Sequence, residues 1–337
     1  MKAVYLDYAA TTPLDPHVLS AMHECLQMEY GNPSSVHQKG QAAANLIAQA
    51  RQTVAELFQV KPQEIIWTSG ATESNNLAIK GVALSYPAGK HIITSQIEHE
   101  SVMDSCTMLS KQGYEITYIK PDANGLVSVV DIADSIRKDT ILISIMYVNN
   151  EIGSIQDIAK IAEIAQQNKI LLHVDAVQAA GKISINLAKL PIDLLSMSAH
   201  KIYGPKGVGA LFVRENLRSR LQAQLHGGGQ EYQLRPGTLA THQIVGLAKA
   251  LEIAQERMEI DRQHILMLRQ KFLAGLKKIE DVHINGAEHS MPGIISIAFK
   301  NIPATKLLAA AKEIGLSSKK GITKVKVEEI AVVTAGN

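Results

Sequence analysis

The chain has 337 residues, of which 46% are hydrophobic and 20% are charged, and its formal net charge is +2. This length predicts two domains, or one large domain with a smaller attachment. The near-neutral charge gives no electrostatic basis for nucleic acid or an anionic membrane as a direct partner. No apolar run approaches the ~20 residues that a membrane span requires.

The beginning of the chain and its cysteines indicate a cytoplasmic protein. The stretch "MKAVYLDYAATTPLDP" has neither the apolar core of a signal peptide nor the arginine-rich character of a transit peptide. Cys25 and Cys106 are the only cysteines. Two thiols alone make neither a disulfide framework nor a zinc site, so we expect a reducing compartment and no metal centre.

Up to about residue 242, short apolar runs alternate with amphipathic stretches, a pattern typical of a parallel sheet covered by helices. The predicted strands cover residues 64–69, 91–96, 115–120, 141–148, 170–176, 193–198 and 209–213. The last two follow each other so closely that we expect them to be antiparallel neighbours. The stretch 157–169 repeats its apolar residues with helical spacing and predicts an amphipathic helix.

After Thr241 the pattern becomes helical. Residues 243–279 contain no proline and predict one long helix, followed by a strand at 293–299, a helix at 304–315 and an indistinct tail. We therefore expect a large α/β domain formed by residues 15–242. Residues 1–14 and 243–337 would form a smaller α+β domain.

A lysine follows the predicted strand 193–198, in "SAHKIYGPKGVGAL". Lys201 has three possible roles: a solvated surface residue, part of a phosphate-binding glycine loop, or a nucleophilic amine in an active site. The glycines at 204–209 lead into a strand, whereas a dinucleotide loop opens a helix. A dinucleotide site at this loop is therefore disfavoured.

An earlier segment, "WTSGATESNNLAIKG" (67–81), predicts a strand, a turn of small residues and a helix that begins near Thr72. The first N–H groups of a helix lack internal partners and attract anions. The turn at Ser69–Thr72 is thus a candidate phosphate site. A plain strand-to-helix turn capped by a threonine explains the same residues equally well.

Asp175 lies near the end of the predicted strand 170–176, directly after its apolar run. This is the edge at which parallel sheets bind ligands. By itself this carboxylate could simply cap a helix. Pyridoxal 5'-phosphate (PLP) needs an amine for a Schiff base, a carboxylate for its ring nitrogen and a cradle for its phosphate. Lys201, Asp175 and the Gly70–Thr72 turn would supply one each, and this combination predicts a PLP site.

The ordered motifs "YLDYAATTP", "GNPSSVH", "SGATESNNLAIKG", "EHESV", "VNNEIGSIQD", "HVDAVQAAGK", "SAHKIYGPKGVGAL" and "GGGQEYQLRPGT" resemble those of class-V, fold-type-I PLP enzymes, and the cysteine desulfurases most closely. The resemblance covers about residues 4–318. It implies an α/β fold with a mostly parallel seven-stranded sheet covered by helices, a smaller α+β domain, and a homodimer.

The resemblance also implies roles for individual residues. Lys201 would form the Schiff base and move protons, His99 would stack on the ring and act in acid–base steps, and Asp175 would pair with the ring nitrogen. The remaining cofactor-binding residues implied are Gln178 at the ring hydroxyl, Ala71, Thr72, Ser198 and His200 at the phosphate, Asn150 beside the substrate carboxylate, and Thr238, which would reach the phosphate in the partner subunit.

The resemblance ends at Ser318. In the family, a loop with the catalytic cysteine and a strand with the carboxylate-binding arginine follow, whereas "KKGITKVKVEEIAVVTAGN" contains neither residue type. An incomplete or interrupted sequence is the favoured explanation, because the agreement stops abruptly. A variant with another reaction and an inactive copy are the alternatives. Cys25 and Cys106 are expected to be inert buried thiols on helices.

The resulting hypothesis is a PLP-dependent desulfurase that converts L-cysteine to L-alanine and delivers sulfur for iron–sulfur clusters or thiolated tRNA, with sulfur-acceptor or scaffold proteins as partners. A class-V aminotransferase or lyase without a protein cysteine is one alternative, and a silent PLP-binding dimeric scaffold is another. Whether Arg235 replaces the missing arginine stays open. Glu98 and Glu100 are expected on a solvated rim, and "GGGQE" (227–231) could be only a flexible loop.

Overall fold

The computed structural model describes residues 4–86, 88–311, 314–319 and 330–334. Its main feature is a seven-stranded sheet in which β8 is antiparallel to both neighbours and all other adjacent pairs are parallel. In spatial order the strands are β2 (Ile65–Thr68), β8 (Gly209–Val213), β7 (Leu194–Ser198), β6 (Leu171–Asp175), β5 (Thr140–Met146), β3 (His91–Ser95) and β4 (Glu115–Ile119). The seven predicted strands and the antiparallel placement of the last one are confirmed.

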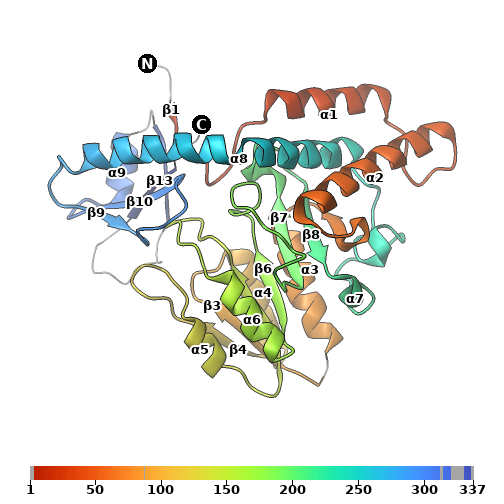
Figure 1. Cartoon of the computed structure of the whole chain (residues 1–337), viewed down its shortest axis with the longest axis horizontal. Helices are drawn as coiled ribbons and strands as arrows, with labels where there is room; N and C mark the ends of the chain where they lie inside the picture. Colours follow the sequence, from red (N-terminus) through yellow and green to blue (C-terminus); the bar gives the residue numbers. More distant parts are fainter. Residues whose placement is uncertain (1–3, 87, 312–313, 320–329, 335–337) are drawn as a thin grey trace.

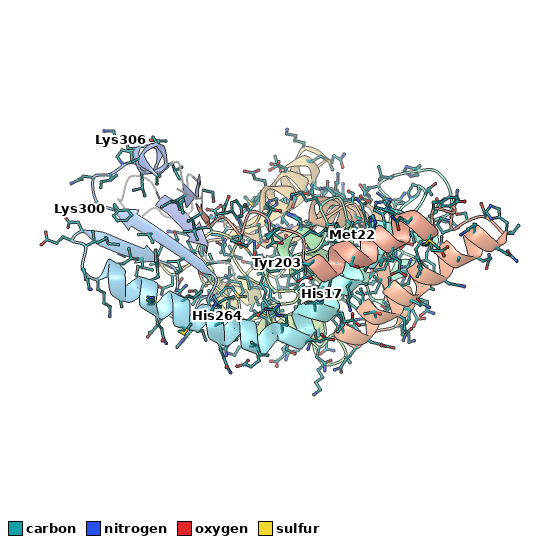
Figure 2. The ribbon with its side chains drawn as sticks, turned by 90° about the horizontal axis from the view of Figure 1, so that it is seen from above. His17, Met22, Tyr203, His264, Lys300 and Lys306 are labelled. Atoms are coloured by element: carbon teal, nitrogen blue, oxygen red, sulfur yellow. The ribbon has the colours of Figure 1, made fainter. Side chains whose placement is uncertain are left out.

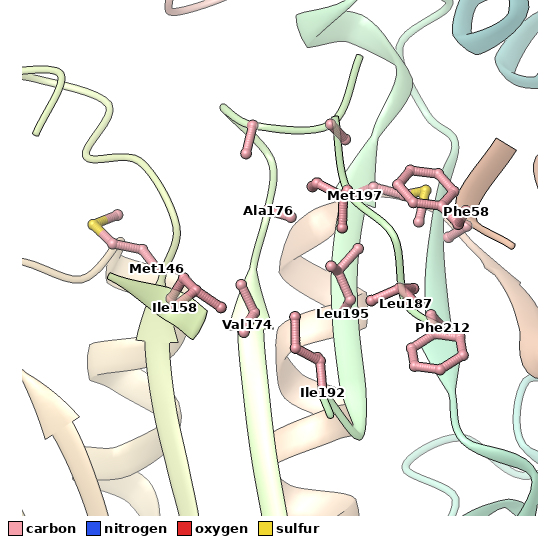
Figure 3. Close-up of a cluster of buried hydrophobic side chains, with 14 of the residues drawn as sticks. Phe58, Met146, Ile158, Val174, Ala176, Leu187, Ile192, Leu195, Met197 and Phe212 are labelled. Atoms are coloured by element: carbon pink, nitrogen blue, oxygen red, sulfur yellow. The ribbon is translucent and has the colours of Figure 1, made fainter. Parts of the chain in front are cut away.

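The strands are continuous apolar runs because both faces of the sheet are covered. Successive side chains point to opposite faces, so Ile92 and Leu142 belong to one core whereas Ile93 and Ile143 belong to the other. Figure 3 shows part of the second of these cores, where strand side chains such as Leu195 meet side chains from the helices and loops.

Helices cover each face of this sheet (Figure 1). α3 (Ala71–Ser85) and α4 (Glu100–Lys111) bury apolar side chains in one core. α5 (Val129–Asp134) and α6 (Ile158–Gln167) bury theirs in the other. The helix predicted at 157–169 is therefore confirmed as α6.

The long helix α8 (Thr241–Leu276) extends from the main sheet to the smaller C-terminal sheet (Figure 1). α1 (Pro16–Met28) and α2 (Gln38–Phe58) pack against it. Figure 2 shows α1, with its labelled residues His17 and Met22, running beside α8. α7 (Glu215–Arg218) is a single turn. The predicted long helix is confirmed, with bounds that differ by two or three residues.

The C-terminal part contains a four-stranded antiparallel sheet, a helix and a two-stranded pair that joins the two ends of the chain. These elements are β9 (Val282–Asn285), β10 (Ile294–Phe299), α9 (Ala304–Ala310), β12 (Ser317–Lys319), β13 (Ile330–Thr334), and β1 (Val4–Tyr5) paired in parallel with β11 (Ile314–Gly315).

The predicted helix at 304–315 is wrong in its last residues. α9 ends at Ala310, and Ile314–Gly315 instead pair with β1. Pairing with a distant strand here overrides the local helical pattern. The strand at 293–299 is confirmed as β10, and the tail without a clear pattern contributes β12 and β13. The domain boundaries stay a prediction.

None of the helices in the described ranges combines the length and the apolar character needed to cross a membrane.

A histidine lies inside the main sheet. His173 of β6 is fully buried between two hydroxyl groups, with Nδ1 2.8 Å from Ser144 Oγ and Nε2 3.0 Å from Ser196 Oγ. Burial lowers the pKa of His173 from 6.5 to about 3. The folded protein therefore holds this imidazole neutral in moderately acidic solution.

This pKa predicts an acid-dependent loss of stability. In the unfolded chain His173 becomes protonated below about pH 6.5. In the folded protein the same imidazole stays neutral down to about pH 3. The free energy of unfolding should therefore fall as the pH drops through this window, at no more than ~1.4 kcal/mol per pH unit for this group. His173→Gln should make the decline shallower in urea titrations at several pH values. The exposed His264→Gln is the control (Figure 2), and equal slopes for His173→Gln and the unaltered chain would contradict the prediction.

Candidate functional site

A cavity of about 760 Å³ opens at the carboxyl ends of β5, β6 and β7, beside the first turn of α3. Its volume is in the range of small-molecule sites. All predicted site residues except Thr238 line it: Ala71, Thr72, His99, Asn150, Asp175, Gln178, Ser198, His200 and Lys201. Thr238 is exposed in the segment before α8, and its expected reach into a partner subunit stays a prediction.

Lys201 ends a short 3₁₀ turn, Ala199–Lys201, that directly follows β7. Its Nζ donates hydrogen bonds to the carbonyl oxygens of Ala9 (2.5 Å) and Ala10 (2.8 Å). The amine is thus held at the cavity wall by the N-terminal segment.

The glycine-rich loop after Lys201 leads into β8, as the sequence predicted. A Cβ atom at Gly209 would lie 2.6 Å from the carbonyl oxygen of Met197 and 2.7 Å from Cα of Gly70. Glycine is therefore required here because the start of β8 passes directly against the turn after β2. This contact brings the turn at Gly70 next to the end of β7.

Asp175 is the last residue of β6 and is only 6% exposed. Its Oδ1 accepts from the N–H of Val177 (3.0 Å), and its Oδ2 accepts from Nδ2 of Asn75 (2.7 Å). Burial raises the pKa of Asp175 despite these bonds and the nearby charges of His99 and Lys201. A buried carboxylate at a cavity is suited to a ligand that presents a protonated nitrogen.

A hydrogen-bonded chain connects Asp175 to His99. Asn75 Nδ2 also donates to Ser101 Oγ (2.9 Å), and Ser101 Oγ lies 2.9 Å from Nδ1 of His99. The N–H of Ser101 donates to the same Nδ1 (3.1 Å). Because a backbone N–H can only donate, we assign Nδ1 as an acceptor, so Nε2 carries the proton of the neutral ring. Asn75 and Ser101 were not predicted from the sequence.

The anion end of the cavity is the turn between β2 and α3. Gly70 adopts φ 153° and ψ 179°, which side chains rarely permit, and α3 begins at Ala71. The free N–H groups of this first turn and the Thr72 hydroxyl provide donors for an anion. A Cβ atom at Gly70 would lie 3.9 Å from Ser198 Oγ, so this hydroxyl belongs to the same end.

His200 adds a neutral donor. Burial, together with the charges of Lys201, Lys206 and Lys182, lowers the pKa of His200 to about 4. Its Nδ1 lies 3.1 Å from Thr11 Oγ1. The donors at this end thus suit a phosphate, and the whole set of amine, buried carboxylate and anion turn fits PLP.

Gln178 is held from both sides. Its Nε2 donates to the carbonyl oxygen of Ala9 (2.9 Å), and its Oε1 accepts from Nζ of Lys182 (3.0 Å). Burial and the charge of Lys201 lower the pKa of Lys182 to about 7. Lys182, which was not singled out from the sequence, lines a neighbouring cavity of about 420 Å³ that shares Gln178 and Lys201 with the first.

The expectation that Glu98 lies on a solvated rim is wrong. Glu98 is 9% exposed, and its Oε1 accepts from Ser95 Oγ (2.5 Å) and the N–H of Met146 (3.0 Å). Burial raises its pKa to about 8, and the charge of Asp175 acts in the same direction. Glu98 precedes the start of α4, and its side chain contacts the end of β5 at Met146. Glu100, two residues later and the first residue of α4, is exposed as expected.

Both cysteines are buried on helices, as predicted, and neither lines the cavity. Burial raises the pKa of Cys25, and burial with the charge of Glu98 raises that of Cys106 to about 12. Arg235 pairs with Glu73, and no arginine is among the described residues that line the cavity. Ser317 lines it, whereas residues 320–329, which follow the point where the family's cysteine loop would begin and contain no cysteine, lie outside the described part.

Removal of the donor between Asp175 and Ser101 should destabilise the folded chain. Asn75→Ala leaves the buried Asp175 carboxylate short of a hydrogen bond, at a cost of about 1–3 kcal/mol in the free energy of unfolding. Asn76→Ala is the matched control, because Asn76 Nδ2 contacts only Thr72 O of its own helix (2.8 Å); its effect should stay within about 0.5 kcal/mol. Urea unfolding at pH 7 measures both, and equal losses would contradict the role given to Asn75.

Comparisons with known proteins identify the family. The sequence profile of aminotransferase class-V matches residues 4–327. A cysteine desulfurase IscS of Aeromonas salmonicida strain A449 is 52% identical, with coverage of 98% of this chain and 83% of the relative. That of Pseudomonas aeruginosa PAO1 is 48% identical, with the same coverage.

Solved structures agree. A structure titled as a NifS-like protein has a TM-score of 0.94 and 38% identity, with 98% of this chain and 93% of that chain covered. SspA in complex with cysteine has a TM-score of 0.89 and 34% identity, with 98% of each chain covered. The fold is thus that of the fold-type-I PLP enzymes, and the chain belongs to the class-V aminotransferase family and, within it, to the cysteine desulfurases.

Proposed function

We propose that this chain binds PLP and uses it to remove sulfur from L-cysteine. The observation that carries this proposal is the convergence of one lysine amine, one buried carboxylate and one helix N-terminus on a single cavity. Relatives named cysteine desulfurase, and a similar structure titled as a complex with cysteine, support the same reaction.

Each part of the cofactor has a candidate partner. The amine of Lys201 would hold the aldehyde carbon, and the carboxylate of Asp175 would hold the protonated ring nitrogen. Gln178 would bind the ring hydroxyl. The phosphate would be bound by Ala71, Thr72, Ser198 and His200.

PLP supplies an electron sink that stabilises negative charge at the α-carbon of an amino acid. The chain's own residues orient the reactants and move protons. His99 would carry a proton on Nε2, because its Nδ1 is occupied by Ser101. The amine of Lys201 would serve as the second proton carrier once it is free of the cofactor. Asn150 would lie beside the substrate carboxylate.

The group that accepts the sulfur must be something other than the thiols of Cys25 and Cys106. The thiols of Cys25 and Cys106 are buried and their pKa values are raised, so they are poor nucleophiles. With a small thiol as acceptor, one L-cysteine and two thiols would give L-alanine, hydrogen sulfide and one disulfide. The same burial favours a second candidate function, that of a PLP-binding scaffold without turnover.

The setting of this reaction is also a proposal. We infer a cytoplasmic homodimer in which Thr238 reaches the phosphate bound by the partner subunit. Proteins that accept sulfur for iron–sulfur clusters or thiolated tRNA would be its partners.

Spectroscopy tests cofactor binding. Purified protein with PLP should show an absorbance band near roughly 400–430 nm. Lys201→Ala should lose this band, because no amine then holds the aldehyde. Lys189→Ala, which removes an exposed lysine that does not line the cavity, is the control and should keep the band. A colourless unaltered protein would overturn the cofactor assignment.

Product analysis tests the reaction. L-Cysteine with an excess of a dithiol should yield alanine and sulfide in equal amounts, with no change in yield for Cys25→Ser. Keto acid with sulfide and ammonia would indicate a lyase. In a parallel sample that also contains a 2-oxo acid as amino-group acceptor, mercaptopyruvate would indicate an aminotransferase. A bound cofactor with no product would indicate the scaffold.

A further inference from the structure

A carboxylate lies where the anion is expected to bind. Glu73 belongs to the first turn of α3 and lines the same cavity as Gly70, Ala71 and Thr72. Its Oε2 accepts from the N–H of Ser69 (2.8 Å). This bond fastens the turn, but a charged carboxylate beside a phosphate is repulsive unless another group compensates its charge.

Arg235 supplies that compensation. Its Nε lies 2.9 Å from Oε1 of Glu73, and one terminal nitrogen lies 3.5 Å from Oε2. The two side chains are 23% and 18% exposed, so solvent screens them only in part. Burial acts against ionisation of Glu73, yet the bonds from Arg235 and Ser69 hold its pKa below the ordinary value. Glu73 is therefore charged and paired.

The guanidinium of Arg235 contacts Glu73 but does not itself line the cavity. Arg235 is not among the described residues that line it, so it is placed to act on the carboxylate and not on a ligand directly. Lys206 and Lys201 are the cations that do line the cavity.

The segment that carries Arg235 is firmly attached to the main sheet. Glu231, which ends the stretch 227–231 that could have been only a flexible loop, is 6% exposed and pairs with Arg51 (2.5 Å). Its Oε2 also accepts from the N–H of Trp67 in β2 (2.8 Å). Leu234 is buried next to Arg235. The segment thus holds its position without the contact to Glu73, which makes the ion pair testable by substitution.

We propose that Arg235 is a positioning residue for phosphate binding: it neutralises Glu73 and holds it against the N–H of Ser69, so that the phosphate of the cofactor can occupy the turn at Gly70–Thr72. The inference rests on the proposed function for the identity of the ligand. It also explains why Arg235 cannot substitute for an arginine that binds the substrate carboxylate, because Glu73 already engages it.

A double-mutant cycle on Arg235 and Glu73 tests this role. Arg235→Gln should weaken the binding of PLP by about tenfold, because it leaves Glu73 uncompensated. Glu73→Gln alone should change the affinity less than about threefold, since an amide oxygen still accepts from Ser69. The double variant should return to within about threefold of the unaltered chain. Trp67 is the single tryptophan and lies just before the turn, so its fluorescence reports binding without turnover.

Three controls keep the outcomes distinct. Pyridoxal, which lacks the phosphate, should bind all variants equally. Inorganic phosphate alone, titrated against the fluorescence of Trp67, should follow the same ranking as PLP, and this arm still tests the inference if the unaltered chain fails to hold PLP at Lys201. Arg220→Gln removes one charge at the far end of α3, where the Arg220 carbonyl oxygen accepts from Ser85, and should have no effect.

A double variant as weak as Arg235→Gln would mean direct contact between Arg235 and phosphate, or collapse of the segment, and would overturn the proposal. Unchanged affinity in Arg235→Gln would overturn it as well. Equal loss for pyridoxal and PLP would also contradict it, because the effect would then not depend on the phosphate.

Discussion

The site depends on the close contact between the backbones of Gly70 and Gly209. Their separation is so small that a Cβ atom at Gly209 would lie within 2.7 Å of Cα of Gly70. This contact is possible because β8 runs antiparallel between β2 and β7, so the start of β8 meets the end of β2. The helix N-terminus that follows β2 thereby lies beside the lysine that follows β7. If β8 ran parallel to these neighbours, its start would lie at the opposite edge of the sheet, and Gly209 could not meet Gly70.

Around this contact the protein keeps titratable groups in surroundings that disfavour their charged forms. Burial raises the pKa values of Glu98 and Asp175 and lowers those of Lys182 and His200. Such perturbed groups concentrate at functional sites, because catalysis needs charges that are weakly solvated and ready to respond to a ligand. The price is stability, which hydrogen bonds from Asn75 and backbone groups restore only in part.

The sequence was sufficient for features that depend on local pattern or on the ends of strands. Asp175 and Lys201 follow buried strands, and parallel strands present such ends at one edge, so their proximity followed from topology. The inward orientation of the Glu98 side chain could not be predicted, because its neighbours in the sequence are a mixture of polar and apolar residues. Asn75 lies one helical turn after the anion site, but only the packing of α3 on the sheet shows which side chain it meets. The end of α9 was missed because its next residues pair with a strand some 310 positions away.

The N-terminal segment has a consequence for the order in which the protein folds. Residues 9–12 hold Lys201 and the His200 backbone across about 190 positions, and Asp7 accepts from Ser317 across 310. These residues are synthesised before the segments that they contact, yet they can dock only after the sheet and the C-terminal strands exist. Contacts of such long sequence separation form late, because the entropic cost of closing the long loop must be met before the contact contributes any stabilising free energy. We therefore expect the wall that holds the lysine amine to be the last part of the cavity to assemble, although its residues are synthesised before the other residues that line the cavity.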